Sequence, residues 1–358
     1  MDIETKLDLV RQVGEEIITE DDLRILLETN DNPIAYDGFE PSGNIHIAQG
    51  LLRTININKM LKAGVRFKLW VADWFGWMNN KMGGDLDKIK TVGEYFIEVW
   101  RACGLDVDKV DFLWASDEMD KKEYWKLVIQ IARNNTVKRI TRCAQIMGRN
   151  ETESLSAAQI FYPCMQCADI FHLKADIAQL GMDQRKVNML AREIGPALKF
   201  KKPVAVHHHM LMGLTQPPAT ELSGIDKKIA MKMSKSKPDT AIFMTDPYDE
   251  IKRKFKKAYC PEKIIEENPV MEYAKYIVFE RFDTFKVERP EKYGGDLLFN
   301  TYDELCQSFV KGELHPFDLK MGIADHIEKL IEPVRKHFET NTKARALLEK
   351  VESFKTTR

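Results

Sequence analysis

The chain has 358 residues, of which 44% are hydrophobic, 30% charged and 9% aromatic. This composition excludes disordered and fibrous proteins, and the length exceeds what one hydrophobic core usually serves, so we expect about two domains. The formal net charge is only -1. Any affinity for a polyanion such as nucleic acid must therefore come from basic residues that gather locally.

The first residues, MDIETKLDLVRQVGEEI, predict an amphipathic helix, because charges of both signs alternate with apolar positions. This mixture is not typical of a secretory signal, and no apolar run approaches the roughly 20 residues that cross a bilayer. The six cysteines follow no regular spacing, as in proteins of a reducing compartment. We expect a cytoplasmic protein without membrane contacts, in which residues 1–30 form an N-terminal helical segment.

Residues 31–222 alternate short β-rich runs with longer helical stretches. The predicted strands are NPIAY, VRFKLWVAD, VDFLWAS, ADIAQL and PVAVHHH, and the first intervening helix is expected from about Ile45 to Ala63. Alternating strands and helices predict an α/β domain with a doubly wound, parallel, Rossmann-like sheet. In such sheets ligands bind beyond the carboxyl ends of the strands.

The turn GFEPSGNIH follows the first predicted strand. Gly38 and Gly43 have the spacing of a P-loop, but Asn44 and Ile45 stand where Lys and Ser/Thr would be needed, which disfavours a Walker-type nucleotide site. The turn can still direct backbone N–H groups and a positive helix end toward an anion, and His46 on the first helical turn can donate to a phosphate oxygen. An ordinary strand-to-helix turn with a surface histidine is the alternative.

A helix through FYPCMQCAD would place Tyr162, Gln166 and Asp169 on one face, since they recur at i, i+4 and i+7. A polar face among apolar residues suits the wall of a pocket for a polar ligand better than a solvated surface. Cys164 and Cys167 lie in the same helical pattern, and no second cysteine pair exists at zinc-ribbon spacing. We therefore predict two buried cysteines and no metal site.

The segment LGMDQRK begins a helix directly after a strand. Asp183 and Gln184 consequently lie where a ligand at the edge of the sheet would be met. An aspartate at the start of a helix is also a good cap, so both interpretations stay open for Asp183.

The run GLTQPPATELSGIDKKIAMKMSKSKPD is rich in turn formers, which predicts a linker with a functional loop at 223–245. Lys232 and Lys235 are compact, mobile cations that can follow charge on a phosphate group, and the neighbouring serines add hydrogen bonds. A solvated basic tract is the alternative. Residues 246–358 have mainly helical patterns and predict a second, α-helical domain.

In this order, PSGNIHIAQG, YPCMQCAD, GMDQRK and MKMSKS resemble the class I aminoacyl-tRNA synthetases, and specifically the tyrosyl-tRNA synthetases of archaeal and eukaryotic type. The resemblance covers nearly the whole chain, because KKAYCPEKIIEENPVMEYAKY, RPEKYGGDL and GELHPFDLK are similar to that family's C-terminal domain. It implies an α-helical anticodon-binding domain, a homodimer, and L-tyrosine, ATP with Mg²⁺ and tRNA(Tyr) as ligands. No appended C-terminal domain is expected.

The resemblance also implies residue roles. Tyr36 and Asp169 would hold the phenol of tyrosine, and the family is the standard example of selection by such buried polar groups. The α-amino group would be bound by Tyr162, Gln166 and Gln184. Catalysis would rest on His46, Lys232 and Lys235. The ATP site would comprise Gly38, Ser42, Gly43, His46, Ala48, Gln49, Gly181, Asp183, Lys232, Met233, Ser234, Lys235 and Ser236. The tRNA contacts would be Arg185 and Lys186 at the acceptor stem and Tyr293, His315 and Asp318 at the anticodon.

Two stretches depart from the family pattern. In HIAQ, Ala48 replaces the usual glycine and Gln49 replaces the second histidine, so this position cannot act as a cation. The segment DWFG at 73–76 predicts a bulkier, more apolar pocket wall than that of many relatives. A tryptophanyl-tRNA synthetase, or a synthetase-like RNA-binding protein without catalysis, is the alternative; retention of Tyr36 and Asp169 favours a phenol over an indole.

Overall fold

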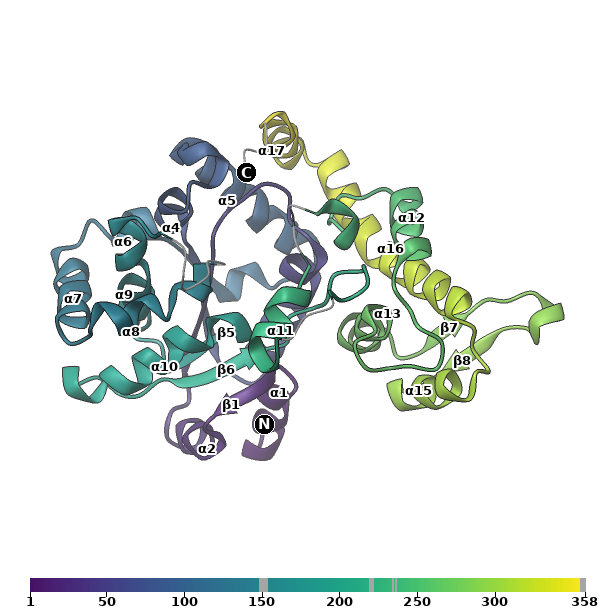
Figure 1. Cartoon of the computed structure of the whole chain (residues 1–358), viewed down its shortest axis with the longest axis horizontal. Coiled ribbons are helices and arrows are strands. Elements are labelled where there is room, and N and C mark those ends of the chain that lie inside the picture. Colours follow the sequence, from purple (N-terminus) through teal and green to yellow (C-terminus); the bar gives the residue numbers. More distant parts are fainter. Residues whose placement is uncertain (148–153, 219–221, 234, 236, 355–358) are drawn as a thin grey trace.

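The computed structural model describes residues 1–147, 154–218, 222–233, 235 and 237–354. The chain forms two lobes: one is built around a six-stranded sheet, and the other consists mostly of helices (Figure 1). Within the described ranges, no helix combines the length and apolar character needed to cross a membrane.

The central sheet has the strand order β1-β6-β5-β2-β3-β4. Strands β2 to β6 are parallel, and β1 pairs with β6 in antiparallel orientation. The strands are β1 (Gly14–Ile18), β2 (Ile34–Phe39), β3 (Arg66–Val71), β4 (Val110–Trp114), β5 (Ile177–Gly181) and β6 (Val204–His208). The order reverses between β2 and β5, which is where doubly wound sheets bind ligands. The predicted fold class is confirmed.

The N-terminal segment differs from the expected purely helical structure. Strand β1 lies between α1 (Ile3–Arg11) and α2 (Glu20–Thr29). Its Ile17 is paired with Val206 of β6, so the strand is an added edge of the sheet. The short run GEEII has little β pattern of its own, and a partner distant in sequence stabilises it as a strand.

Helices cover both faces of the sheet. One face carries α1, α2, α3 and α5, whose apolar residues share a core with Phe39, Phe67 and Val71. The other carries α4, α7, α9 and α10, which pack with Tyr36 and Trp70. The helices that follow α2 in this lobe are α3 (Arg53–Lys62), α4 (Asp73–Met78), α5 (Leu86–Ala102), α6 (Ala115–Glu118), α7 (Lys122–Arg133), α8 (Val137–Thr141), α9 (Ala157–His172), α10 (Arg185–Ile194) and α11 (Gly224–Met231).

The C-terminal lobe is helical, as expected, with one additional hairpin of β7 (Phe285–Val287) and β8 (Leu297–Phe299). Its helices are α12 (Tyr248–Lys257), α13 (Pro269–Tyr273), α14 (Phe279–Arg281), α15 (Tyr302–Lys311), α16 (Pro316–Thr340) and α17 (Thr342–Ser353). The last two helices pack against α5, which joins the lobes (Figure 1).

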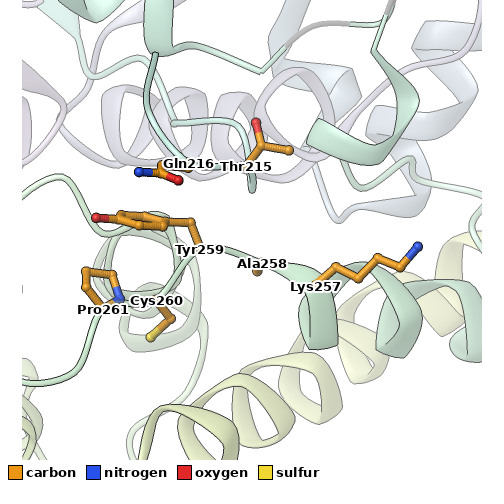
Figure 2. A pocket seen from close by; sticks show the side chains of 7 residues that line it. All are labelled: Thr215, Gln216, Lys257, Ala258, Tyr259, Cys260 and Pro261. Atoms are coloured by element: carbon orange, nitrogen blue, oxygen red, sulfur yellow. The ribbon is translucent and has the colours of Figure 1, made fainter. Parts of the chain in front are cut away.

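A pocket of about 450 Å³ lies where the segment after β6 passes the end of α12 (Figure 2). It is lined by Thr215, Gln216, Lys257, Ala258, Tyr259, Cys260 and Pro261. The Tyr259 backbone N–H donates to Leu214 O at 2.7 Å, which closes one side. None of the predicted site residues lines this pocket, so it is separate from the candidate site below.

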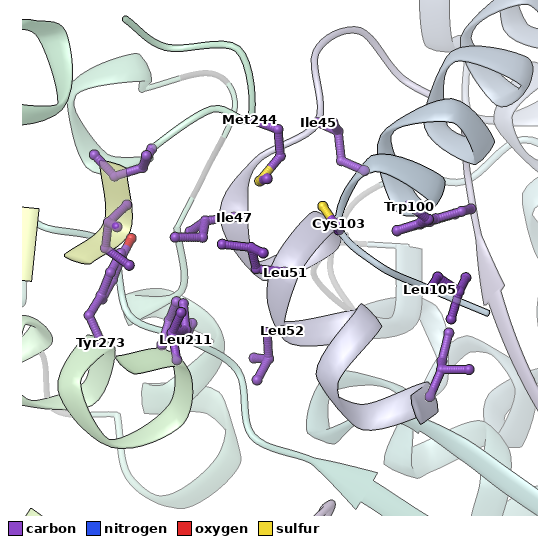
Figure 3. Packing of buried hydrophobic residues seen from close by; sticks show 14 of the residues in the cluster. Ile45, Ile47, Leu51, Leu52, Trp100, Cys103, Leu105, Leu211, Met244 and Tyr273 are labelled. Atoms are coloured by element: carbon purple, nitrogen blue, oxygen red, sulfur yellow. The ribbon is translucent and has the colours of Figure 1, made fainter. Parts of the chain in front are cut away.

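The turn that carries His46 packs, through buried apolar residues, against the segment that follows the loop of Lys232 and Lys235, here called the lysine loop. Ile47 N donates to Ile242 O at 2.8 Å, and Met244 N donates to Ile45 O at 3.0 Å. The side chains of these residues are buried together with Tyr273 of α13 (Figure 3). The turn that carries His46, the segment after the lysine loop and the C-terminal lobe therefore share one core.

His209 joins three parts of the chain directly after β6. Its Nδ1 lies 3.0 Å from Glu15 of β1, its Nε2 lies 3.0 Å from Glu272 of α13, and its ring stacks on Tyr276. Glu15 also pairs with Lys228 of α11. Burial opposes the imidazolium, but the two carboxylates outweigh this effect and raise the pKa of His209 to about 9. His209 is therefore a cation at neutral pH.

We predict that this cluster stabilises the protein below pH 9 and not above it. The folded pKa of His209 is above its usual value of about 6.5, so its contribution is complete below pH 6.5 and is lost as the pH rises through 9. The shift corresponds to about 3 kcal/mol. His209→Gln should lower the free energy of unfolding in urea by about this amount at pH 7 and by much less at pH 10. An equal loss at both pH values would contradict the charge-based role.

Candidate active site

A buried polar cluster lies on the α9 side of the sheet, near the carboxyl end of β2. Tyr36 of β2 and Tyr162, Gln166 and Asp169 of α9 are all buried. The three residues of α9 share the predicted face, because the helix is continuous from Ala157 to His172 and they recur at i, i+4 and i+7. A capping box of Ser156 and Gln159 starts this helix. Burial, and then the Asp169 charge, raise the pKa of Tyr36 well above its usual value, so its hydroxyl stays protonated and available as a donor.

Asp169 is held by a residue that sequence analysis did not identify. Tyr124 of α7 donates its hydroxyl to Asp169 Oδ1 at 2.7 Å and lies 3.2 Å from Met165 O. The other carboxylate oxygen, Oδ2, is buried and has no hydrogen-bond partner in the described part of the chain. Burial raises the pKa of Asp169, and the Tyr124 hydrogen bond partly offsets this. One acceptor is thus fixed in place and the other is open to a ligand.

Glu40 is a second residue that sequence analysis did not identify. It follows β2 and accepts hydrogen bonds from Tyr162 Oη at 2.6 Å and Asn79 Nδ2 at 2.5 Å. Lys81 lies 3.6 Å from its other oxygen. Because Tyr162 donates its proton to Glu40, the lone pairs of the Tyr162 oxygen can accept from a ligand.

Gln166 and Gln184 are in direct contact although 18 residues separate them. Gln166 Nε2 donates to Gln184 Oε1 at 3.0 Å, and Gln184 Nε2 donates to Ile146 O at 3.2 Å. Gln184 belongs to the turn after β5, so the contact joins α9 to the edge of the sheet. The structure therefore brings together two of the three residues expected to bind the amino group, Gln166 and Gln184.

The turn after β2 forms the opposite side of the candidate site. Gly43 has a φ of 58°, a left-handed conformation that favours glycine, and this places Ser42 at the sheet edge. His46 is buried, and its Nδ1 has no hydrogen-bond partner among the described residues. Burial, and then the charges of Lys235 and Lys232, lower the pKa of His46 well below its usual value. Its imidazole is neutral and can donate one N–H.

Both predicted lysines point into the same region. Lys235 Nζ donates to Ser42 O at 2.6 Å and Ser42 Oγ at 3.3 Å, and it lies over the Phe96 ring. Burial, and then Lys81 and Arg53, lower the pKa of Lys235 to about 7. Met233 is buried between the two lysines. Ser234 and Ser236 lie outside the described residues.

Asp183 pairs with Lys232 at the end of β5. Their Nζ and Oδ2 atoms are 2.7 Å apart. Burial raises the pKa of Asp183, but the charge and hydrogen bond of Lys232, together with the Gln184 hydrogen bond and the His208 charge, outweigh burial, and the pKa is lowered. A Cβ atom on Gly181 would lie 2.7 Å from Asp183 Oδ1, so glycine is required for this carboxylate to approach the strand end. Asp183 is therefore not merely a helix cap.

The two departures from the family pattern also have structural counterparts. Ala48 and Gln49 begin a helical turn whose Gln49 carbonyl accepts from Trp100 Nε1 at 2.7 Å. The Gln49 side-chain oxygen is buried and has no partner in the described ranges. The DWFG segment is the start of α4, and Phe75 packs edge-on against Tyr162 with ring centroids 4.7 Å apart. The bulkier wall thus contacts the polar face of α9.

The residues expected to contact nucleic acid lie in two places. Arg185 begins α10, where its Nε is 2.8 Å from Glu16 of β1. Lys186 borders a pocket of about 230 Å³ together with Asp183. Tyr293 lies on the β7–β8 connection and is 61% exposed.

The remaining two candidates, His315 and Asp318, are at the start of α16, where His315 Nδ1 accepts from Phe317 N. Arg289 holds this start beside the β7–β8 connection. It donates to Gly295 O and to Glu313 O, both at 2.9 Å. Tyr293 and the two α16 residues therefore occupy one end of the C-terminal lobe.

A metal site has no support among the described residues. No group of three or more His, Cys, Asp or Glu side chains has the geometry to hold an ion there. Cys164 and Cys167 are buried inside α9 as free thiols, and burial raises the pKa of both.

Different signals were available for the two missed residues. Glu40 could have been found, because a carboxylate at the carboxyl end of a parallel strand lies where ligands bind. Tyr124 could not, because it belongs to the apolar stripe of α7 with Leu127, Val128 and Ile131. Nothing in that stripe separates a core tyrosine from one that holds a ligand-binding carboxylate.

Comparisons with known proteins agree with this geometry. The family model for class I tRNA synthetases (W and Y) matches residues 28–332. A cytoplasmic tyrosine–tRNA ligase 1 of Arabidopsis thaliana is 53% identical over 100% of this chain and 90% of its own. A tyrosyl-tRNA synthetase of Pyrococcus horikoshii solved with L-tyrosine has a TM-score of 0.90, 39% identity, and coverage of 98% and 100%. One of Leishmania major solved with tyrosinol has a TM-score of 0.90 and 45% identity, and the chain covers 66% of its length.

We predict that Tyr124→Phe destabilises the protein by about 1–3 kcal/mol, because the buried Asp169 Oδ1 loses the one side-chain donor that reaches it among the described residues. Tyr273→Phe is the matched control: its hydroxyl is also buried but has no partner among the described residues. Denaturant unfolding should show a loss for the first variant and little change for the second. Similar effects of both substitutions would mean that Tyr124 contributes only packing.

Proposed function

The chain belongs to the class I tRNA synthetases for tyrosine and tryptophan, and from this premise we propose how its own residues carry out the reaction. It is a tyrosine–tRNA ligase. The carboxylate of L-tyrosine attacks the α-phosphate of ATP, pyrophosphate leaves, and a ribose hydroxyl at the tRNA end then takes the tyrosyl group and releases AMP. The observation that supports the residue roles best is Asp169, with one oxygen held by Tyr124 and the other open beside Tyr36.

The phenol of tyrosine would be read by Tyr36 and Asp169. Asp169 Oδ2 accepts the phenol proton, while the protonated Tyr36 hydroxyl donates to the phenol oxygen. Phenylalanine would leave both groups unpaired in a buried site, which is the main source of selectivity in sites of this kind. The similarity to the tyrosine–tRNA ligases named above supports tyrosine, and not tryptophan, as the amino acid substrate.

The α-ammonium group would be bound on the α9 face by Tyr162, Gln166 and Gln184. Glu40 adds the negative charge that this arrangement otherwise lacks. Because the Tyr162 proton is already directed at Glu40, the Tyr162 oxygen accepts from the ammonium while the carboxylate balances its charge. The substrate carboxylate is then directed away from α9, toward the turn after β2.

ATP would lie across the crevice between β2 and β5. Asp183 and the backbone at Gly181 suit the ribose, and Ala48 leaves room for the adenine. His46 supplies a neutral donor to the phosphates, and Lys235 and Lys232 supply cations as charge develops on the leaving pyrophosphate. No protein nucleophile is required.

Before the two lysines can contact the phosphates of ATP, Lys232 must break its ion pair with Asp183 and Lys235 must break its hydrogen bonds to Ser42. The low pKa of Lys235 means that a polyanion beside it would draw a proton onto the amine. Mg²⁺ would enter on the phosphate oxygens of ATP; when bound, it would neutralise phosphate charge.

The tRNA contacts are proposed at both ends of the molecule. Tyr293 is exposed and suited to stacking on a base. At the start of α16, the Asp318 carboxylate can accept a hydrogen bond from a base edge, and His315 provides an imidazole ring beside it. Lys186 faces the pocket beside Asp183, as expected for an acceptor-stem contact. Arg185 would exchange Glu16 for a phosphate.

A homodimer is supported by an exposed apolar surface on the catalytic lobe. Trp74 lies 6.3 Å from Trp77 and 6.5 Å from Trp125 between ring centroids. Trp77 and Ile129 are about half exposed, and Trp125 and Ile129 are one turn apart on α7 at the outer edge of the lobe (Figure 1). Clustered aromatic residues on a surface are typical of protein interfaces.

We propose the cytoplasm as the compartment of this protein, because the name of the Arabidopsis relative gives that location.

We predict that tyrosine drives ATP–pyrophosphate exchange far more efficiently than tryptophan or phenylalanine. Lys235→Ala should lower the exchange rate by about 10²- to 10³-fold, the usual effect of removing one group that stabilises a transition state. Lys237→Ala, an exposed lysine two residues further on, is the control and should retain activity. Exchange that tryptophan drives best would reject the tyrosine assignment.

We also predict that the α7 surface joins two copies of the chain. The wild-type protein should sediment with twice the mass of one chain, and Ile129→Asp should sediment as a monomer because it places a charge in an apolar interface. Ile25→Asp, at an equally exposed position on α2, should leave the mass unchanged. If Ile129→Asp remains dimeric, the interface lies elsewhere.

A further inference from the structure

The indole N–H of Trp70 has no hydrogen-bond partner in the described part of the chain. Trp70 lies on β3 and is 1% exposed, and its Nε1 atom is completely buried. A buried indole N–H normally finds an acceptor, since leaving it unpaired is unfavourable. The missing acceptor therefore points to a ligand.

The N–H edge of this indole borders the same space as the Tyr36 hydroxyl. Gly38 on β2 is the register partner of Trp70 on β3. A Cβ atom on Gly38 would lie 3.4 Å from Tyr36 Oη and 3.6 Å from Trp70 Cδ1, the carbon bonded to Nε1. Because Gly38 has no side chain, the Tyr36 hydroxyl and the indole edge of Trp70 both approach the same point above its Cα. Tyr36 and Trp70 also belong to the same core, on the α9 side of the sheet.

The hydrogen-bonding capacity of a phenol oxygen matches the polar groups of Asp169, Tyr36 and Trp70. A phenol oxygen donates one proton and accepts two hydrogen bonds. Among the described residues Asp169 Oδ2 is an acceptor without a partner, and Tyr36 and Trp70 are donors, so these three groups match the one donor and two acceptor positions of a phenol. We propose that Trp70 Nε1–H donates to the phenol oxygen of bound tyrosine and is a specificity-determining group; this rests on the tyrosine-binding role proposed above.

A purely structural role is the competing explanation. Asp73, three residues after Trp70, has a buried Oδ2 atom without a partner, while its Oδ1 accepts from Trp74 N and Ser116 N. A water molecule between Trp70 and Asp73 would satisfy both groups without any ligand. Such a water would be the same whether tyrosine or phenylalanine were bound, and this difference provides the test.

Trp70→Phe removes the N–H and keeps an aromatic ring. We expect kcat/KM for tyrosine in ATP–pyrophosphate exchange to fall about 10- to 100-fold, because a buried phenol oxygen loses a donor. For phenylalanine it should change less than about 3-fold, since this substrate never made the bond. Trp70→His, which restores a ring N–H, should recover part of the tyrosine-to-phenylalanine ratio. Trp114→Phe on β4, whose ring packs on Gly93 on the other face of the sheet, should leave the ratio unchanged.

A second measurement needs no variant. In protein labelled with ¹⁵N-tryptophan, one of the six indole N–H signals should move on addition of L-tyrosinol and not of L-phenylalaninol. Equal losses for both substrates in Trp70→Phe, or no indole signal that distinguishes the two alcohols, would overturn the proposal. Wild-type protein without tyrosine-dependent exchange would instead refute the proposed function itself.

Discussion

The site depends on backbone pairing between two segments nearly 200 residues apart. Ile45 and Ile47, on either side of His46, exchange hydrogen bonds with Met244 and Ile242 just after the lysine loop. This pairing is buried in the core that also includes Tyr273 of the C-terminal lobe. The segment that follows the two lysines is therefore anchored beside the turn that carries His46. Phosphate chemistry needs cationic groups that are held near the reacting atoms, and this pairing supplies a fixed end point for the segment that carries them.

Electrostatics follows from this packing. Burial, and then the neighbouring cations, keep His46 neutral and lower the pKa of Lys235 to about 7. In the structure the lysines contact the protein's own acceptors, Asp183 and Ser42. An incoming triphosphate would replace these acceptors and relieve the repulsion among the cations. The site is therefore arranged for a highly charged ligand before that ligand arrives.

On the α9 side of the site, hydrogen-bond geometry and not the crowding of charges would select the ligand. Asp169 is oriented by Tyr124, and Glu40 orients Tyr162. In both pairs, one side chain uses part of its hydrogen-bonding capacity inside the protein and keeps the remainder for a ligand. Buried groups that are satisfied only in part are unfavourable in the free protein, and a ligand of matching shape and polarity removes that penalty.

The sequence alone determined the alternation of strands and helices, the polar face of α9, and the place of Gly43, His46, Asp183 and the lysines along the chain, because periodicity and turn chemistry are local properties. It could not predict β1, which is a strand only through its pairing with β6. Nor could it reveal that Tyr124 reaches Asp169, or that the Trp70 indole N–H finds no acceptor among the described residues. Tertiary structure decided these features, since a buried aromatic residue has the same sequence signature whether its polar atom meets protein, ligand or nothing.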